Sequence, residues 1–107
     1  MSERLVVLCT VGGAEEAGRI ARELVERRLA ACVNILGGVT SVYRWQGKTA
    51  QEPEHLMIVK TTADRFGALR EAIAAIHPYE VPEILALPIA AGHEPYLAWL
   101  DRSVEDQ

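Results

Sequence analysis

The chain has 107 residues, of which 50% are hydrophobic and 24% are charged, and its formal net charge is −4. This length suits one domain with a single modest core, so we expect one domain over residues 1–107, and the balance of residue types excludes a disordered or collagen-like chain. The acidic net charge and the scattered basic residues argue against nucleic-acid binding, which needs a basic patch.

The longest apolar run, ILALPIAA, is far too short to cross a membrane. Residues 1–4 lead directly into an apolar segment without the features of a secretory signal, so we expect no membrane association and a cytoplasmic location. The two cysteines, Cys9 and Cys32, are too few for a disulfide framework. In a reducing compartment a free cysteine usually behaves as a small buried hydrophobe.

The first two predicted elements are a buried strand and an amphipathic helix. Residues 4–11, RLVVLCTV, are apolar at odd and even positions alike, which is typical of a strand buried on both faces. Residues 14–31 place their apolar side chains on one helical stripe, with glutamates in the first turn and arginines in the last. We therefore predict a helix over 14–31.

A long β-hairpin follows. CVNIL begins a second strand at residue 32, Gly37 and Gly38 permit a bulge, and residues 39–47 continue the strand with side chains alternating between two faces. After a turn, HLMIVKT at 55–61 returns as the third strand. We expect this hairpin to reach well beyond the body of a domain of this size.

The last elements complete a recognisable order. Thr62 or Asp64 caps a second helix, which Pro78 ends. Residues 83–89 form a fourth strand, again apolar on both faces, and Pro95 suits the first position of a short terminal helix. The order β-α-β-β-α-β with an added C-terminal helix predicts an α+β fold of the ferredoxin-like, split βαβ kind.

Such a fold covers one sheet face with its two main helices. The first and fourth strands, however, are apolar at both odd and even positions, and so on both faces of the sheet. Either the extra helix or other subunits must cover the second face. An oligomer would also explain the long hairpin, whose edges it could share with neighbouring copies.

Seven segments of the chain resemble the CutA family of divalent-cation-tolerance proteins in order and spacing: VVLCT, RLAACVNI, SVYRWQGK, IVKTT, HPYEVPEI, LPI and YLAWL. The resemblance covers nearly the whole chain. It implies a ferredoxin-like homotrimer whose sheets face one another around a threefold axis. It also implies a role in tolerance to divalent ions, copper first among them, and no enzymatic activity.

The family's copper-site pattern carries over to Cys9 and His77, whose soft thiolate and imidazole groups suit copper. In members with that site a further histidine directly precedes the one in this motif, and here that position is Ile76. Cys32 lies in the matching AACVNI segment and is a chemically reasonable alternative ligand. The ion bound, copper or another divalent cation, stays open.

A second reading is a trimeric signalling or scaffold module that binds a small ligand or a protein partner in clefts between subunits, since trimeric nitrogen-regulatory proteins share a similar architecture. Six residues could line such clefts: Tyr43, Trp45, Lys60, Tyr79, Glu80 and Glu83. An enzyme is the least favoured reading, because Ser41, Cys9 and His77 form no nucleophile signature.

Overall fold

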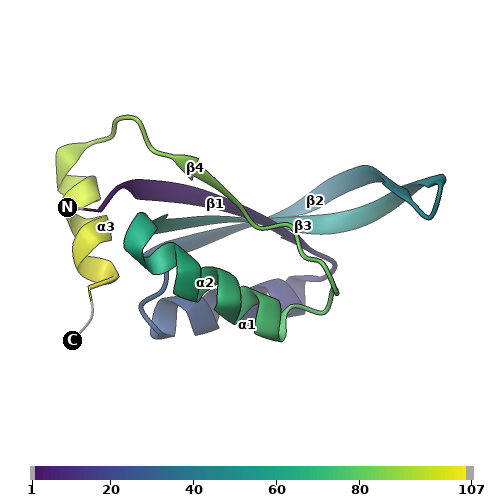
Figure 1. The fold of residues 1–107 in the computed structure, drawn as a ribbon, viewed down its shortest axis with the longest axis horizontal. Helices are drawn as coiled ribbons and strands as arrows, with labels where there is room; N and C mark the ends of the chain where they lie inside the picture. Colours follow the sequence, from purple (N-terminus) through teal and green to yellow (C-terminus); the bar gives the residue numbers. More distant parts are fainter. Residues whose placement is uncertain (1, 106–107) are drawn as a thin grey trace.

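The computed structural model describes residues 2–105, which form an α+β fold with a four-stranded sheet in the order β2-β3-β1-β4 (Figure 1). All neighbouring strands run antiparallel. The elements in chain order are β1 (Arg4–Val11), α1 (Ala14–Glu26), β2 (Cys32–Trp45), β3 (Lys48–Thr62), α2 (Ala63–Ile76), β4 (Leu85–Pro88) and α3 (Glu94–Ser103). The predicted α+β class and element order are confirmed.

The hydrophobic core lies between one face of the sheet and the two long helices. Both α1 and α2 lie on the same side of the sheet in Figure 1. Alternate residues of β1 are buried against them, as the period of two in a strand requires. The central core side chains are Val7, Cys9, Val11, Ile20, Leu24, Met57, Val59, Leu69 and Ile73.

Helix α1 ends earlier than predicted. The prediction extended it to residue 31, but it stops at Glu26, and Arg28 adopts a left-handed conformation with φ of 58°. Leu29 lies beyond the helix but is still buried in the core. Its backbone N–H donates to the carbonyl of Leu24 and so closes the end of the helix. Ala31 then donates to the carbonyl of Lys60, so pairing with β3 replaces the last helical turn.

The third strand begins earlier than predicted, at Lys48 rather than at residue 55, and Pro53 lies inside it opposite Thr40. Residues 48–54 pair with β2 only, because β1 pairs with β3 from residue 55 onward. A proline can therefore occupy this part of β3, where one edge is free. The bulge at Gly37 and Gly38 occurs as predicted, between Leu36 and Val39.

The fourth strand is shorter than predicted. The structure assigns 85–88 rather than 83–89 to β4, an edge strand that pairs with residues 5–8 of β1. Beyond it, α3 lies at the end of the sheet farthest from the hairpin tip (Figure 1). Its Leu100, together with Val104 just after the helix, packs against Ala31 in a small cluster separate from the main core. Among residues 2–105, no helix has the length and apolar character needed to span a bilayer.

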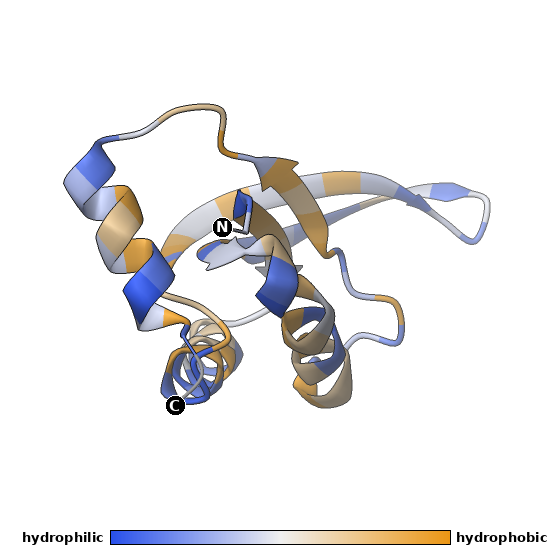
Figure 2. Cartoon of the chain, turned by 60° about the vertical axis from the view of Figure 1, so that its left-hand side comes forward, coloured by the Kyte–Doolittle hydropathy of each residue, from blue (hydrophilic) through white to orange (hydrophobic). Residues whose placement is uncertain are grey.

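The sheet face opposite α1 and α2, called the open face below, is largely apolar. Cross-strand partners share a face, so Val6 lies with Leu87 and Leu8 lies with Leu85. The face continues across β3 and β2 with Leu56, Ile58, Lys60, Cys32, Asn34 and Leu36. Figure 2 shows the hydrophobic colour of β4, the strand at one edge of the sheet. Leu85 and Leu87 remain 56% and 50% exposed.

Candidate functional site at the end of β1

His77 links the end of α2 to the end of β1. Pro78 prevents the helix from continuing, and the backbone of His77 is extended, with φ of −73° and ψ of 137°. Its imidazole Nδ1 accepts the backbone N–H of Tyr79 at 3.1 Å, so Nε2 carries the proton and donates to the carbonyl of Thr10 at 2.8 Å. The side chain is buried. Both ring nitrogens are therefore occupied, and neither offers a lone pair to a metal ion.

Cys9 lies beside this link, since Thr10 is its neighbour in β1. It is fully buried on the helix side of the sheet, opposite Met57. Burial raises the pKa of the Cys9 thiol from 9.0 to about 12, with smaller effects from the charges of Glu83 and Glu54. The side chain is therefore a neutral thiol at physiological pH, whereas a metal ligand must be a thiolate.

Cys32 lies on the opposite face of the sheet from Cys9. It pairs with Lys60, which pairs in turn with Val6, so all three side chains belong to the open face. Cys32 Sγ lies 3.9 Å from Lys60 Nζ, and Lys60 also donates to the side-chain oxygen of Asn34. One chain cannot bring Cys9 and Cys32 to the same ion.

The positions of Cys9, His77 and Cys32 show whether the predicted ligands can form a metal site within one chain. The thiol and the imidazole have the right chemistry for copper, and His77 bonds to the carbonyl of Thr10, the neighbour of Cys9 in β1. In this fold, however, the Cys9 thiol is protonated and both imidazole nitrogens of His77 are hydrogen-bonded, so neither side chain is in a form that binds a metal ion. Within residues 2–105, no three His, Cys, Asp or Glu side chains are grouped to hold an ion. A complete metal centre therefore does not fit within a single chain as it is folded here.

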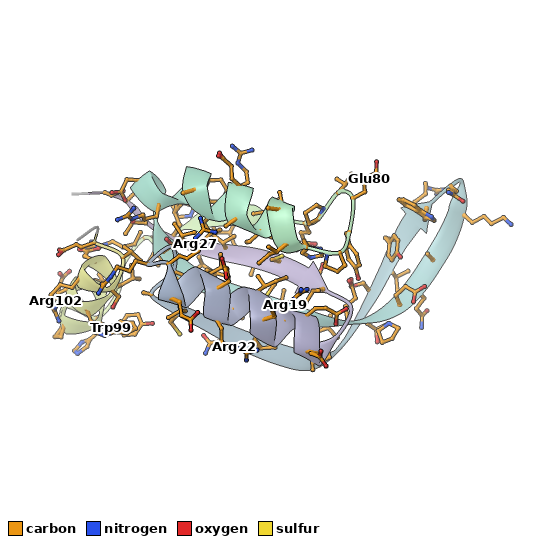
Figure 3. The ribbon with its side chains drawn as sticks, turned by 90° about the horizontal axis from the view of Figure 1, so that it is seen from below. Arg19, Arg22, Arg27, Glu80, Trp99 and Arg102 are labelled. Carbon is orange, nitrogen blue, oxygen red and sulfur yellow. The ribbon has the colours of Figure 1, made fainter. Side chains whose placement is uncertain are left out.

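The six predicted cleft residues divide into separate places. Tyr79, Glu80 and Glu83 belong to the loop between α2 and β4, where Figure 3 shows Glu80 at the outside of the molecule. Tyr43 and Trp45 lie exposed on the hairpin, with Trp45 62% exposed. Lys60 is separate from both groups, on the open face next to Cys32.

Glu54 is a site residue that the sequence did not indicate. Its carboxylate accepts a hydrogen bond from the Tyr79 hydroxyl at 2.6 Å, although only 8% of the residue is exposed. Burial, this hydrogen bond and the charges of Glu54, Tyr43 and Glu52 raise the pKa of Tyr79 above its usual value. The prediction placed the turn around Gly47 and began the strand at His55, so Glu54 lay outside the predicted strand, and no local pattern signals a buried carboxylate.

The comparisons with known proteins agree with this arrangement. A family model described as CutA1 divalent ion tolerance protein matches residues 5–103. A relative from Thermus thermophilus, named divalent-cation tolerance protein CutA, is 58% identical over 95 residues, covering 89% of this chain and 92% of the relative.

Solved structures give the same result. The divalent cation tolerance protein (Cut A1) from Thermus thermophilus has a TM-score of 0.93 and 54% identity, covering 95% of this chain and 99% of that chain. CutA from Xylella fastidiosa has a TM-score of 0.95 and 36% identity, covering 97% of this chain and 100% of that chain. The chain belongs to the CutA1 divalent ion tolerance family.

Proposed function

We propose that this chain is a homotrimeric divalent-cation-tolerance protein in which other copies cover the open face. The observation that carries this proposal is the apolar open face itself, which no helix within residues 2–105 covers as α1 and α2 cover the other face. We also place the β2-β3-β1-β4 order in the ferredoxin-like group. The number of copies, three, follows from the family resemblance of the sequence.

Physical chemistry supports the assembly. Fully burying a leucine, isoleucine or valine side chain contributes roughly 1.5 to 3 kcal/mol. The open face carries several such side chains per copy, including Leu8, Ile58, Leu85 and Leu87. Large contiguous apolar patches are rare on soluble monomers and typically mark interfaces.

The assembly is tested by measuring molar mass with light scattering after size exclusion. We expect three times the chain mass for the wild type and a smaller mass for Leu85→Asp/Leu87→Asp, because two charges per copy would enter an apolar interface. Val81→Asp is the matched control, since Val81 is 86% exposed in the loop before β4. A monomeric wild type, or a double variant of unchanged mass, would overturn the proposed interface.

Copper is the ion that we propose to test first, with other divalent cations after it. Support comes from the soft donors of Cys9 and His77 at one end of β1 and from the family's association with divalent-ion tolerance. Because both groups are engaged as described, further donors or a rearranged loop would be required. We therefore assign the metal no mechanistic step.

Competition with a chromogenic Cu(I) chelator measures the affinity directly. We expect Cys9→Ser/His77→Gln to lose binding and Cys32→Ser to keep it, because Cys32 lies on the other sheet face. Circular dichroism checks that the double variant still folds. Equal Cu(I) affinity in the wild type and the double variant would exclude Cys9 and His77 as ligands.

A trimeric scaffold or signalling module is the second candidate, favoured by the exposed aromatic side chains Tyr43, Trp45 and Tyr79. Its ligand would bind between copies, and we propose a cytoplasmic, non-enzymatic role in either case. A thermal-shift screen tests this candidate, because a ligand of the native assembly raises its melting temperature by mass action. A stabilising compound whose effect persists in Tyr43→Ala/Trp45→Ala would exclude these rings as its site.

A further inference from the structure

Three carboxylates belong to the base of the hairpin and to the loop between α2 and β4, the loop that Tyr79 ties to the hairpin. Glu52 and Glu54 are two residues apart on β3 and so point to the same side of the hairpin. Glu54 accepts the hydroxyl hydrogen of Tyr79, and the charges of Glu54 and Glu83 both reach Cys9. We call Glu52, Glu54 and Glu83 the base carboxylates.

No cation within residues 2–105 forms an ion pair with this group. Across that range the ion pairs are Arg4 with Asp101 and Arg27 with Glu23, and neither involves a base carboxylate. Carboxylates as buried as Glu54 are almost always paired with a cation. The base carboxylates therefore form a negative patch that a cation from outside the chain would complete.

The other end of the same hairpin has the opposite charge. Arg44 and Lys48 flank the tip turn, both are exposed, and residues 43–51 contain no acidic side chain. We call Arg44 and Lys48 the tip cations. Lys48 pairs with Trp45 and shares a face with Glu52, from which about 13 Å of strand separates it, whereas Arg44 pairs with Thr49 and points to the opposite face. Neither side chain therefore reaches the base of its own hairpin. The tip projects away from the body of the molecule, where a second copy can meet it (Figure 1).

We propose that the tip cations of one copy bind the base carboxylates of the next copy around the ring. This inference rests on the proposed homotrimer and names the polar contacts that set its register. A closed ring of three uses a head-to-tail interface, in which two different patches of each copy meet. A positive tip and a negative base satisfy that requirement, and their complementarity disfavours other registers. Burial of apolar surface on the open face supplies the bulk of the affinity.

Charge reversal provides the test. The tip variant is Arg44→Glu/Lys48→Glu, the base variant is Glu52→Lys/Glu83→Lys, and a combined variant carries all four changes. All four positions are exposed, and Glu54 is left intact because it holds Tyr79. The control, Arg19→Glu/Arg22→Glu, changes the net charge as the tip variant does but lies on α1, which Figure 3 shows in front of the sheet and away from the hairpin tip.

The readouts are molar mass and the urea midpoint of trimer dissociation at low salt. We expect the tip and base variants each to lower the midpoint by roughly 1 M, and the combined variant to recover most of the loss because each pair is restored with reversed sign. High salt should reduce these differences. The inference is overturned if the combined variant is no more stable than the weaker single-patch variant, or if the control loses as much as the tip variant.

The two proposals fail separately. A monomeric wild type would refute the homotrimer, and this inference with it. A trimeric wild type without recovery in the combined variant would leave the homotrimer intact and refute the charge pairing alone.

Discussion

Two side chains with metal-binding chemistry, Cys9 and His77, have structural roles in this chain. The imidazole of His77 uses both nitrogens to hold the loop after α2 against β1. Cys9 fills the core as a small apolar side chain, and its buried environment opposes ionisation. The same burial that weakens Cys9 as a ligand makes its titration measurable as a change in stability.

Cys9 should make the native state less stable at high pH. Its pKa is about 12 when folded and 9.0 ordinarily, so above pH 9 the unfolded chain loses a proton that the folded chain keeps. Stability from this group is thus full below pH 9 and is lost as the pH rises toward 12. Between pH 9 and pH 11 the loss should be about 2 to 3 kcal/mol.

Urea unfolding of the wild type and Cys9→Ala at both pH values measures this loss. Both chains share every other alkaline titration, so the difference between them isolates the thiol. Parallel stability profiles for the two chains would contradict the burial of Cys9.

At the scale of the elements, the hairpin and the second helix each contain one glycine of interest. The backbone conformation requires a glycine in the hairpin but not in the helix. Gly38 lies in the β2 bulge with φ of 76°, a left-handed conformation that other residues rarely adopt. Gly67 lies inside α2, where an added Cβ would meet nothing within 4 Å. The first glycine is required by its backbone, and the second only weakens its helix.

Alanine at the two positions should therefore have opposite effects. We expect Gly38→Ala to lower the free energy of unfolding by about 1 to 2 kcal/mol. Gly67→Ala should raise it by about 0.5 to 1 kcal/mol through helix propensity. Denaturant titration of both variants gives the signs, and a stabilising Gly38→Ala would refute the bulge geometry.

Helix α3 is attached to the body by a salt bridge in its last turn. Arg4 donates two hydrogen bonds to Asp101, at 3.0 and 2.7 Å, which lower the pKa of the carboxyl. Because the pair is partly exposed, Asp101→Asn should cost no more than about 1 kcal/mol at pH 7. A depressed carboxyl pKa stabilises the fold above its ordinary value near 4, and this contribution is lost as the pH falls through the lowered pKa.

Amide hydrogen exchange in α3 measures this attachment. Asp101→Asn should exchange faster than the wild type at neutral pH, and the difference should shrink as the pH falls below the ordinary carboxyl pKa. Glu105→Gln, beyond the end of α3, is the control for removing one negative charge. Equal exchange in Asp101→Asn and the wild type at pH 7 would rule out a stabilising role for the pair.

At the scale of the whole molecule, the fold leaves one sheet face and one end of its hairpin without a partner within residues 2–105. If three copies complete each other, folding and association are linked by mass action. The urea midpoint of the wild type should then rise with protein concentration, while that of Leu85→Asp/Leu87→Asp should not. Far-ultraviolet circular dichroism over a hundredfold concentration range measures both, and a wild-type midpoint independent of concentration would argue against a linked assembly.

The element order followed from local signals, because hydrophobic periodicity and proline act through neighbours in the chain. Pro78 marked the end of α2 correctly, since its ring excludes helical backbone before it. Local signals failed where distant partners decide the outcome. Ala31 continues a helical pattern but pairs with Lys60, and Pro53 looks like a break but lies in a strand with one free edge.

The candidate site divides in the same way. The sequence identified His77 and Tyr79, because a histidine and a tyrosine beside Pro78 stand out in one short segment. It could not reveal that Glu54 binds Tyr79 across 25 positions, nor that Cys9 and Cys32 face opposite sides of the sheet. Strand register sets the faces of the two cysteines, and the path of the loop after α2 brings Tyr79 to Glu54.

The sequence by itself therefore determined which segments become helices and strands, in what order, and that two strands are apolar on both sides. Only the tertiary structure decided where the hydrogen-bonding groups of His77 go, which charges lack partners among the described residues, and which face stays open. The physical reason is range: backbone preferences act over a few residues, whereas burial, pairing and electrostatic balance depend on side chains that the fold brings together.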